Sequence, residues 1–187
     1  MLIRPARRTT AAGGAGSVTA LPQSATTVQI DPHLDDDWVN PTNVTDEGSN
    51  DASITSQSFD NGDQSYILKA YNFDFSGIPG GATIVGIEVI INGRCSANNN
   101  HTVDYVRTLN ANNNPYGDDK GSTNPQNLQQ VAADYTWGTS SDMWGRTSID
   151  IDSVQSSNFG VGFGVLSNQN NADVHSDYVK ITVHYTE

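Results

Sequence analysis

The sequence predicts an all-β sandwich, and three observations carry this prediction. Short runs of alternating apolar and polar residues recur along the chain, which is the pattern of half-buried strands. Turn-forming residues separate these runs, and glycine alone accounts for 17 of the 187 residues. Segments with the apolar period of a helix are missing, while residues that disfavour helices are abundant. A chain of eight or more short strands with this turn chemistry is typical of a β-sandwich.

The first 25 residues differ from the rest, and we expect an extended basic arm attached to a sandwich domain over residues 26–187. This segment has no hydrophobic period, and its middle is a linker-like run of small residues. Arg4, Arg7 and Arg8 make it basic, because no acidic residue precedes Asp31. Such a segment cannot bury enough apolar area to offset its ordering entropy, so we expect it to become ordered on a partner.

The charge of the body is opposite to that of the arm. The first 30 residues carry +3, and the remaining 6 basic and 21 acidic residues carry −15, which gives −12 for the chain. Nucleic acid and anionic membrane surfaces repel an acidic body, so we expect neither as a partner. No run approaches the roughly 18 apolar residues of a membrane span. The N-terminus lacks the apolar centre of a signal peptide, which predicts synthesis in a cytoplasm.

The body is expected to consist of short strands joined by turns. The predicted strands span residues 27–30, 52–56, 65–75, 82–92, 102–109, 158–165 and 178–185. The strand over 82–92 is the most apolar, and apolar residues on both of its faces indicate a central position or contact with another subunit. We expect 102–109 to return as its antiparallel partner across an Asn-rich turn. A long loop then runs from Asn110 to Asn127.

The last two strands are predicted to form a C-terminal hairpin. In the first of them, Phe159, Val161, Phe163 and Val165 share one face, and the opposite face is glycine at positions 160, 162 and 164. In the second, Val179, Ile181, Val183 and Tyr185 share a face. Two half-buried strands joined by the polar loop 167–177 favour direct antiparallel pairing.

Candidate catalytic and metal-binding groups are sparse. Seven acidic residues fall between Asp31 and Asp51 without the spacing of a calcium loop, so we expect a solvated turn anchored by Trp38, with calcium as the lesser alternative. The four histidines are too far apart for a helical zinc pair, and no Gly-x-Ser-x-Gly motif occurs. Cys95 is the only cysteine, which rules out an internal disulfide. The sequence therefore predicts a protein without a metal, a cofactor or catalytic residues, and not an enzyme.

Three aromatic residues are candidates for a glycan-binding site. Sandwich domains can bind sugars through exposed rings beside Asn, Asp and Gln side chains on loops. Tyr116, Trp137 and Trp144 lie near Asn-rich loops and suit this role. In the alternative, which we prefer, the tryptophans close the ends of the sandwich core.

Several segments form a combination that points to a family. They are Asp36-Asp37-Trp38 with Asn40-Pro41, Tyr66-Ile67-Leu68-Lys69, Phe73-Asp74-Phe75 with Ile78-Pro79, Ala82 to Val89, Trp144-Gly145, Asn158 to Val161 and Asp177 to Val183. This set resembles the jelly-roll-like sandwich domains of tailed-phage virion proteins, such as head decoration (cement) proteins, head fibres and tail appendages. The resemblance covers residues 35–186 and leaves out the first 30. It implies an antiparallel jelly-roll-like β-sandwich of about eight strands with an extended N-terminal arm, and it supplies no catalytic residue.

The resemblance implies a structural role in a virion. The expected function is that of a capsid decoration or cement protein, made in the host cytoplasm and located on the capsid surface, which binds and stabilises the phage head shell. Its arm would contact the major capsid protein or other virion subunits through Leu2, Ile3, Arg4, Arg7 and Arg8. A homo-oligomer, by analogy a trimer, would match the threefold positions of a shell. The alternative is a head-fibre or tail appendage domain that binds host surface glycans.

Overall fold

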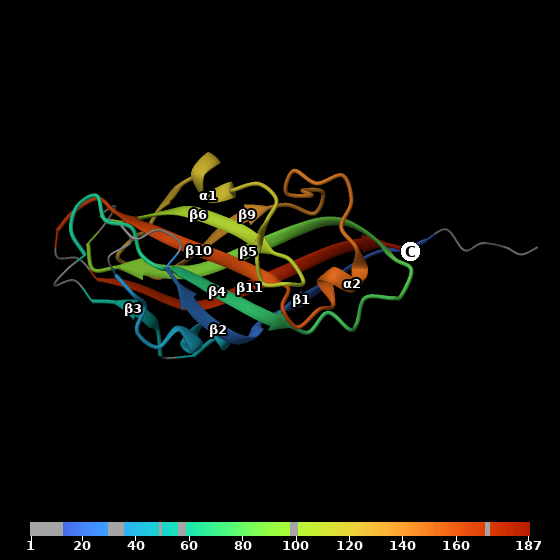
Figure 1. Cartoon of the computed structure of the whole chain (residues 1–187), viewed down its shortest axis with the longest axis horizontal. Helices are drawn as coiled ribbons and strands as arrows, with labels where there is room; N and C mark the ends of the chain where they lie inside the picture. The colour runs from blue at the N-terminus through green and yellow to red at the C-terminus, as the bar shows by residue number, and fades with distance from the viewer. Residues whose placement is uncertain (1–12, 30–35, 49, 56–58, 98–100, 171–172) are drawn as a thin grey trace, which may run out of the picture.

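The computed structural model of the protein consists of two antiparallel sheets packed face to face (Figure 1). It describes residues 13–29, 36–48, 50–55, 59–97, 101–170 and 173–187. Sheet A contains, in spatial order, β1 (Ala15–Ala20), β11 (Val174–Thr186), β5 (Thr83–Cys95) and β9 (Ala133–Gly138), with β3 (Ala52–Ile54) also paired to β11. Sheet B contains β2 (Pro22–Val28), β4 (Ile67–Phe73), β10 (Gly160–Ser167), β6 (His101–Leu109) and β7 (Pro115–Tyr116), with β8 (Gln126–Asn127) also paired to β6. Three single turns of helix complete the described structure: η1 (Pro41–Thr45), α1 (Lys120–Thr123) and α2 (Ile151–Val154).

The chain crosses repeatedly between the two sheets, as it does in a jelly roll. The chain passes from sheet B to sheet A between β4 and β5, returns to sheet B at β6, and changes sheet again before β9, β10 and β11. All ladders between the named strands are antiparallel. Apart from β6, β7 and β8, which all lie in sheet B, strands that are neighbours in sequence thus lie in opposite sheets. The predicted fold class is confirmed.

The predicted C-terminal hairpin is wrong, because β10 and β11 lie in different sheets. β10 pairs with β4 and β6, whereas β11 pairs with β1, β3 and β5. The apolar stripes of the two strands, represented by Phe163 and Ile181, are fully buried and meet inside the sandwich. The expected pairing of 82–92 with 102–109 fails in the same way, since β5 belongs to sheet A and β6 to sheet B.

The predicted boundary of the arm at residue 25 is also wrong. Residues 15–20 form β1, which pairs with β11 so that Val18 lies opposite Val183, and residues 22–28 form β2, which pairs with β4. Ala25 is buried in the core, and the partly buried Val18 packs against the core. Backbone pairing with β11 orders these small residues, although their own side chains bury little apolar area. The sandwich therefore begins by residue 15.

The core is filled by aromatic and branched side chains from both sheets. Its largest fully buried side chains are Trp137, Trp144, Phe59, Phe75, Phe159 and Phe163. Trp38 lies edge-on against Phe163 at a centroid distance of 5.4 Å, and its indole donates a hydrogen bond to the Tyr66 oxygen at 2.9 Å. The prediction that Trp38 anchors the acidic turn is confirmed. Burial of each such side chain contributes about 1.5–3 kcal/mol.

Candidate functional site

The three aromatic residues predicted for glycan binding occupy different environments. Tyr116 is 46% exposed, whereas Trp137 and Trp144 are 2% and 0% exposed. The Trp137 indole donates to the Asn124 oxygen at 3.0 Å, and the Trp144 indole donates to the Ile87 oxygen at 2.9 Å. Both tryptophans therefore close the core, as preferred from the sequence, and cannot contact a ligand. Their assignment to a glycan site was wrong, and Tyr116 alone remains.

Trp144 and the residue after it turn the chain so that Arg146 lies beside Tyr116. Trp144 has φ = 54° and Gly145 has φ = 71°, a left-handed conformation that is rare for a large side chain. The buried indole and the hydrogen bond from the Asp118 amide to the Trp144 oxygen, 2.9 Å long, hold this conformation. The Arg146 guanidinium consequently lies 4.8 Å from the centre of the Tyr116 ring.

The guanidinium of Arg146 is fixed by neutral oxygen atoms. Its Nε donates to the Met143 oxygen, and its Nη2 donates to Thr108 Oγ1, each at 3.2 Å. Among the described residues no carboxylate forms an ion pair with it. Burial lowers the pKa of Arg146 from its ordinary value, and the electrostatic influence of Tyr116 and Asp142 opposes that shift. A desolvated cation without a carboxylate partner is costly unless further acceptors reach it.

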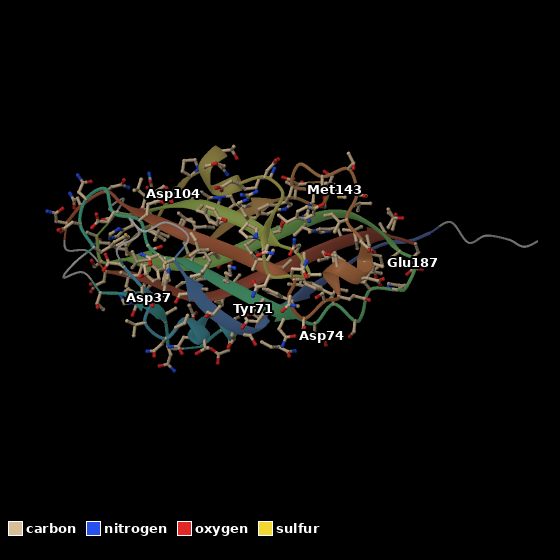
Figure 2. The ribbon with its side chains drawn as sticks, in the orientation of Figure 1. Asp37, Tyr71, Asp74, Asp104, Met143 and Glu187 are labelled. Carbon is tan, nitrogen blue, oxygen red and sulfur yellow. The ribbon has the colours of Figure 1, made fainter. Side chains whose placement is uncertain are left out.

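Tyr116 and Arg146 line a cleft of about 410 Å³. Its walls come from the segment that leads into β7 and from the segment that leads into α2. The other lining residues are Asn110, Ala111, Asn112, Ser148, Ile149, Asp150 and Ser153. Met143, which holds Arg146, lies toward the end of the sandwich that carries Glu187, as Figure 2 shows. We call this site the Tyr116 cleft.

A separate group of acidic side chains lies around the first residues of β11. Asp51 pairs with Arg94 at 2.6 Å and with His175 at 3.3 Å. Burial raises the pKa of Asp177, and the charges of Asp51 and of the acidic residues 46–47 raise it further. Within the described parts of the chain, no group of three or more His, Cys, Asp or Glu side chains is arranged to hold a metal ion. The calcium alternative also involved Asp31 and Asp35, which lie outside the described residues.

Asp104 is a half-buried carboxyl group on β6. It occupies the position in β6 where the register with β10 shifts, so that Val165 pairs with Val103 and Gly164 with Tyr105. Gln64 Nε2 donates to Asp104 Oδ2 at 2.6 Å, while Oδ1 is buried without a partner. Burial raises the pKa of Asp104 to about 6. No sequence pattern indicated this site, because the bulge depends on the partner strand.

The residues predicted to bind a partner through the arm lie outside the described part of the chain. They are Leu2, Ile3, Arg4, Arg7 and Arg8. The described structure does fix the point where this segment joins the sandwich, because the amide of Glu187 donates to the Gly14 oxygen at 3.2 Å. The N-terminal segment therefore joins the sandwich at the edge strand β1, beside the C-terminus marked in Figure 1.

Comparisons with known proteins add little to this description. No protein-family model and no curated protein matches the chain. One similar solved structure is a family two carbohydrate esterase from Cellvibrio japonicus, with a TM-score of 0.28 and 13% sequence identity. The match covers 93% of this chain and 36% of the esterase chain, and a likeness this weak carries no argument about function. The helices in the described residues are too short to cross a membrane.

Proposed function

We propose that the protein is a non-enzymatic structural component of a tailed-phage virion. In this proposal it is a capsid decoration or cement protein that binds and stabilises the head shell through its N-terminal segment. It would be made in the host cytoplasm and reside on the capsid surface, with the major capsid protein or other virion subunits as partners. The proposal draws on the resemblance of residues 35–186 to jelly-roll-like domains of virion proteins.

The observation that carries the proposal is the point at which the basic segment joins the sandwich. Residues 1–12 contain Arg4, Arg7 and Arg8 and no acidic residue, whereas the rest of the chain carries −15. They join the body at β1, the edge strand of sheet A. A segment attached at an edge can reach a neighbouring subunit without disturbing the core, and its charge favours an acidic surface.

Because many copies of the protein would bind a repeating shell, weak contacts of each segment would be sufficient for stable binding. Ordering the segment costs conformational entropy, and each copy makes only a small number of contacts. When one oligomer presents several segments to adjacent subunits, the later contacts form within a single assembly, which raises the overall affinity. A homotrimer on a threefold position is the arrangement that we propose by analogy.

The decisive experiment removes residues 1–12 and measures binding to particles that lack the protein. We expect binding to be lost while the far-UV circular dichroism spectrum and the thermal unfolding of the body stay unchanged. Replacement of Arg4, Arg7 and Arg8 together by Glu should abolish binding, and replacement by Lys should retain most of it. Full occupancy by the truncated protein would refute the role of the segment.

A second candidate function is favoured by the Tyr116 cleft. A head-fibre or tail appendage domain would bind glycans of the host surface, and the cleft combines an exposed ring with polar side chains. This candidate requires a ligand for the cleft, whereas the decoration role requires only the N-terminal segment. Binding assays with the isolated protein and with particles distinguish the two.

A further inference from the structure

We propose that the Tyr116 cleft is a binding site for a neutral saccharide, an inference that rests on the second candidate function and names its ligand class. The site combines an exposed ring that is held in place, several polar groups that make no hydrogen bond to the described residues, and a balanced local charge. The inference does not depend on the N-terminal segment.

The Tyr116 ring can act as a stacking surface because its position is fixed. Its backbone oxygen accepts a hydrogen bond from Thr108 Oγ1 at 2.6 Å, and the residue pairs with Thr108 in the β6–β7 ladder. Arg146 lies against the ring at 4.8 Å. The ring nevertheless remains 46% exposed, so part of its apolar surface is open to solvent. The C–H groups of a sugar ring pack well on such a surface, and a fixed ring loses little entropy on binding.

Several polar atoms of the cleft make no hydrogen bond within the described protein. Arg146 uses Nε and Nη2, which leaves the two N–H groups of Nη1. Asn110 uses only its Oδ1, which accepts from the amides of Asn112 and Asn114. Asp150 uses only Oδ1, which accepts from the Asp152 amide at 3.2 Å.

These free groups include both donors and acceptors, which is what a sugar requires. The Nη1 of Arg146 and the amide nitrogen of Asn110 can donate, and Oδ2 of Asp150 can only accept when ionised. The hydroxyls of Ser148 and Ser153 can do either. A sugar hydroxyl also donates and accepts, so neighbouring hydroxyls of one ring can satisfy a guanidinium and a carboxylate together. The cleft volume of about 410 Å³ is within the range of small-ligand sites.

The charge of the site favours a neutral ligand over an acidic one. Arg146 and Asp150 are the only charged side chains that line the cleft within the described residues, and their charges cancel. The protein as a whole carries −12, which repels an anion at a distance. A sialylated or uronic sugar would place its carboxylate in this field without a second cation to stabilise it.

The test is an NMR titration of the full chain with four neutral disaccharides, lactose, maltose, cellobiose and mannobiose, and with 3′-sialyllactose as the acidic comparison. We expect at least one neutral disaccharide to shift the amide signals of residues 110–117 and 146–153, with a Kd of about 1 mM or tighter. Sialyllactose should bind more weakly than lactose.

Matched variants locate the binding. Tyr116→Ala should weaken the affinity about tenfold, because the stacking surface is lost. Tyr116→Phe should retain most of it. Tyr178→Ala removes a ring of the same size from the outer face of the other sheet, and it should leave the affinity unchanged. Because Tyr116 is exposed, the Ala variant is expected to fold, which its amide spectrum will verify.

Three results would overturn the proposal. They are the absence of signal changes with all four neutral disaccharides, changes confined to residues outside 110–117 and 146–153, and an affinity that Tyr116→Ala does not reduce. Deletion of residues 1–12 should leave saccharide binding intact. Failure of this inference and failure of the decoration role are therefore separate outcomes.

Discussion

The outer faces of the two sheets differ in the residues that their central strands contribute. On sheet B, the central strand β10 presents three glycines outward, and side chains from the neighbouring strands close over them. On sheet A, the central strand β11 presents a row of polar side chains that stay at the surface. The comparison shows that alternation along a strand identifies the residues of its inner face. The burial of its outer face depends on the side chains of the adjacent strands.

The glycine stripe of sheet B creates a second apolar layer outside the core. Ile67 and Leu109 are 3% and 0% exposed, yet neither belongs to the central cluster of buried residues. A Cβ atom added to Gly162 would lie 3.1 Å from Ile67 Cγ2 and 3.6 Å from Leu109 Cδ2. Lys69 crosses the same face, and its Nζ donates to the Asn113 oxygen at 2.8 Å. Glycine is therefore required here for close packing of neighbouring side chains.

The polar stripe of sheet A is held by hydrogen bonds at the surface. Thr19 and Thr182 share a hydrogen bond of 2.8 Å between β1 and β11. The Tyr178 hydroxyl donates to Asp134 Oδ1 at 2.6 Å. Lys180 lies 4.4 Å from the centre of the Tyr178 ring. Such exposed interactions contribute little each, so this face should tolerate substitution.

The largest expected effect comes from adding a methyl group to the glycine stripe. In Gly160→Ala the new Cβ would overlap the backbone oxygen of Ala70 and lie 2.8 Å from Tyr71 Cα, so the ladder between β10 and β4 must move. We expect the free energy of unfolding to fall by about 3 kcal/mol or more, measured by urea denaturation. Thr182→Ala on sheet A is the matched control and should cost about 0.5 kcal/mol or less. Equal losses for the two variants would contradict the comparison.

The second effect is a change in the pH dependence of stability at Asp104 on sheet B. Burial raises its pKa to about 6 from the ordinary 3.8, so the folded state binds the proton more tightly than the unfolded state. The stabilising contribution of Asp104 is therefore full below pH 3.8 and is lost as the pH rises through about 6. We expect Asp104→Asn to stabilise the protein by about 1 kcal/mol at pH 7.5, after allowance for solvent screening.

Urea denaturation at several pH values between 4 and 8 tests this expectation. The advantage of the Asn variant should shrink steadily as the pH falls below about 6. Asp63→Asn is the control, because its side-chain oxygen can still accept from the Asp60 amide. A constant difference between Asp104→Asn and the parent across this range would show that ionisation of Asp104 is not the cause.

The smallest effect concerns the tyrosine of the polar stripe. The hydrogen bond to Asp134, together with burial and the charge of that carboxylate, raises the pKa of Tyr178 to about 12. We expect Asp134→Ala to return this pKa toward 10, and Tyr178→Phe to cost about 0.5 kcal/mol. Ultraviolet titration of phenolate absorbance, with the Tyr178→Phe curve subtracted, measures the shift. An unchanged midpoint in Asp134→Ala would rule out the carboxylate as its main cause.

Much of the fold could be predicted from the sequence, but the strand partners could not. Phe163 and Ile181 are inward residues of their strands, as the alternation indicated. The same pattern arises whether two strands lie side by side or face each other across a core, because in either case one face of each is buried. The hairpin prediction chose the first arrangement, and the jelly roll uses the second.

Local irregularities limited the remaining predictions. At Val85 the register of β5 shifts, so that Ile84 and Ile87 are both buried although they are three residues apart. In β4, Asn72 has φ = 63°, and Phe73 enters the core although alternation placed it on the same face as Lys69. Bulges and left-handed residues leave almost no trace in the composition of a strand.

The candidate cleft was predictable only in part. Tyr116 was selected because it is aromatic and lies in an Asn-rich region, and that reasoning applied equally to the two tryptophans. Arg146 was missed, because its role depends on the left-handed turn at Trp144 that brings it beside Tyr116. The Gly that follows Trp144 was a signal for this turn, since glycine is common at sharp turns.

The attachment of the first residues at β1 determines how the protein would respond to mechanical force. In the β1–β11 ladder Ala15 pairs with Thr186, and the pairs run inward to Ala20 opposite Ile181. A pull on the N-terminal segment, away from Glu187, would load these pairs one after another from the outer end. Strands peeled in this way separate at lower force than strands sheared along their length, because one pair carries the load at a time. Under tension β1 would detach first, and the rest of the jelly roll would remain closed.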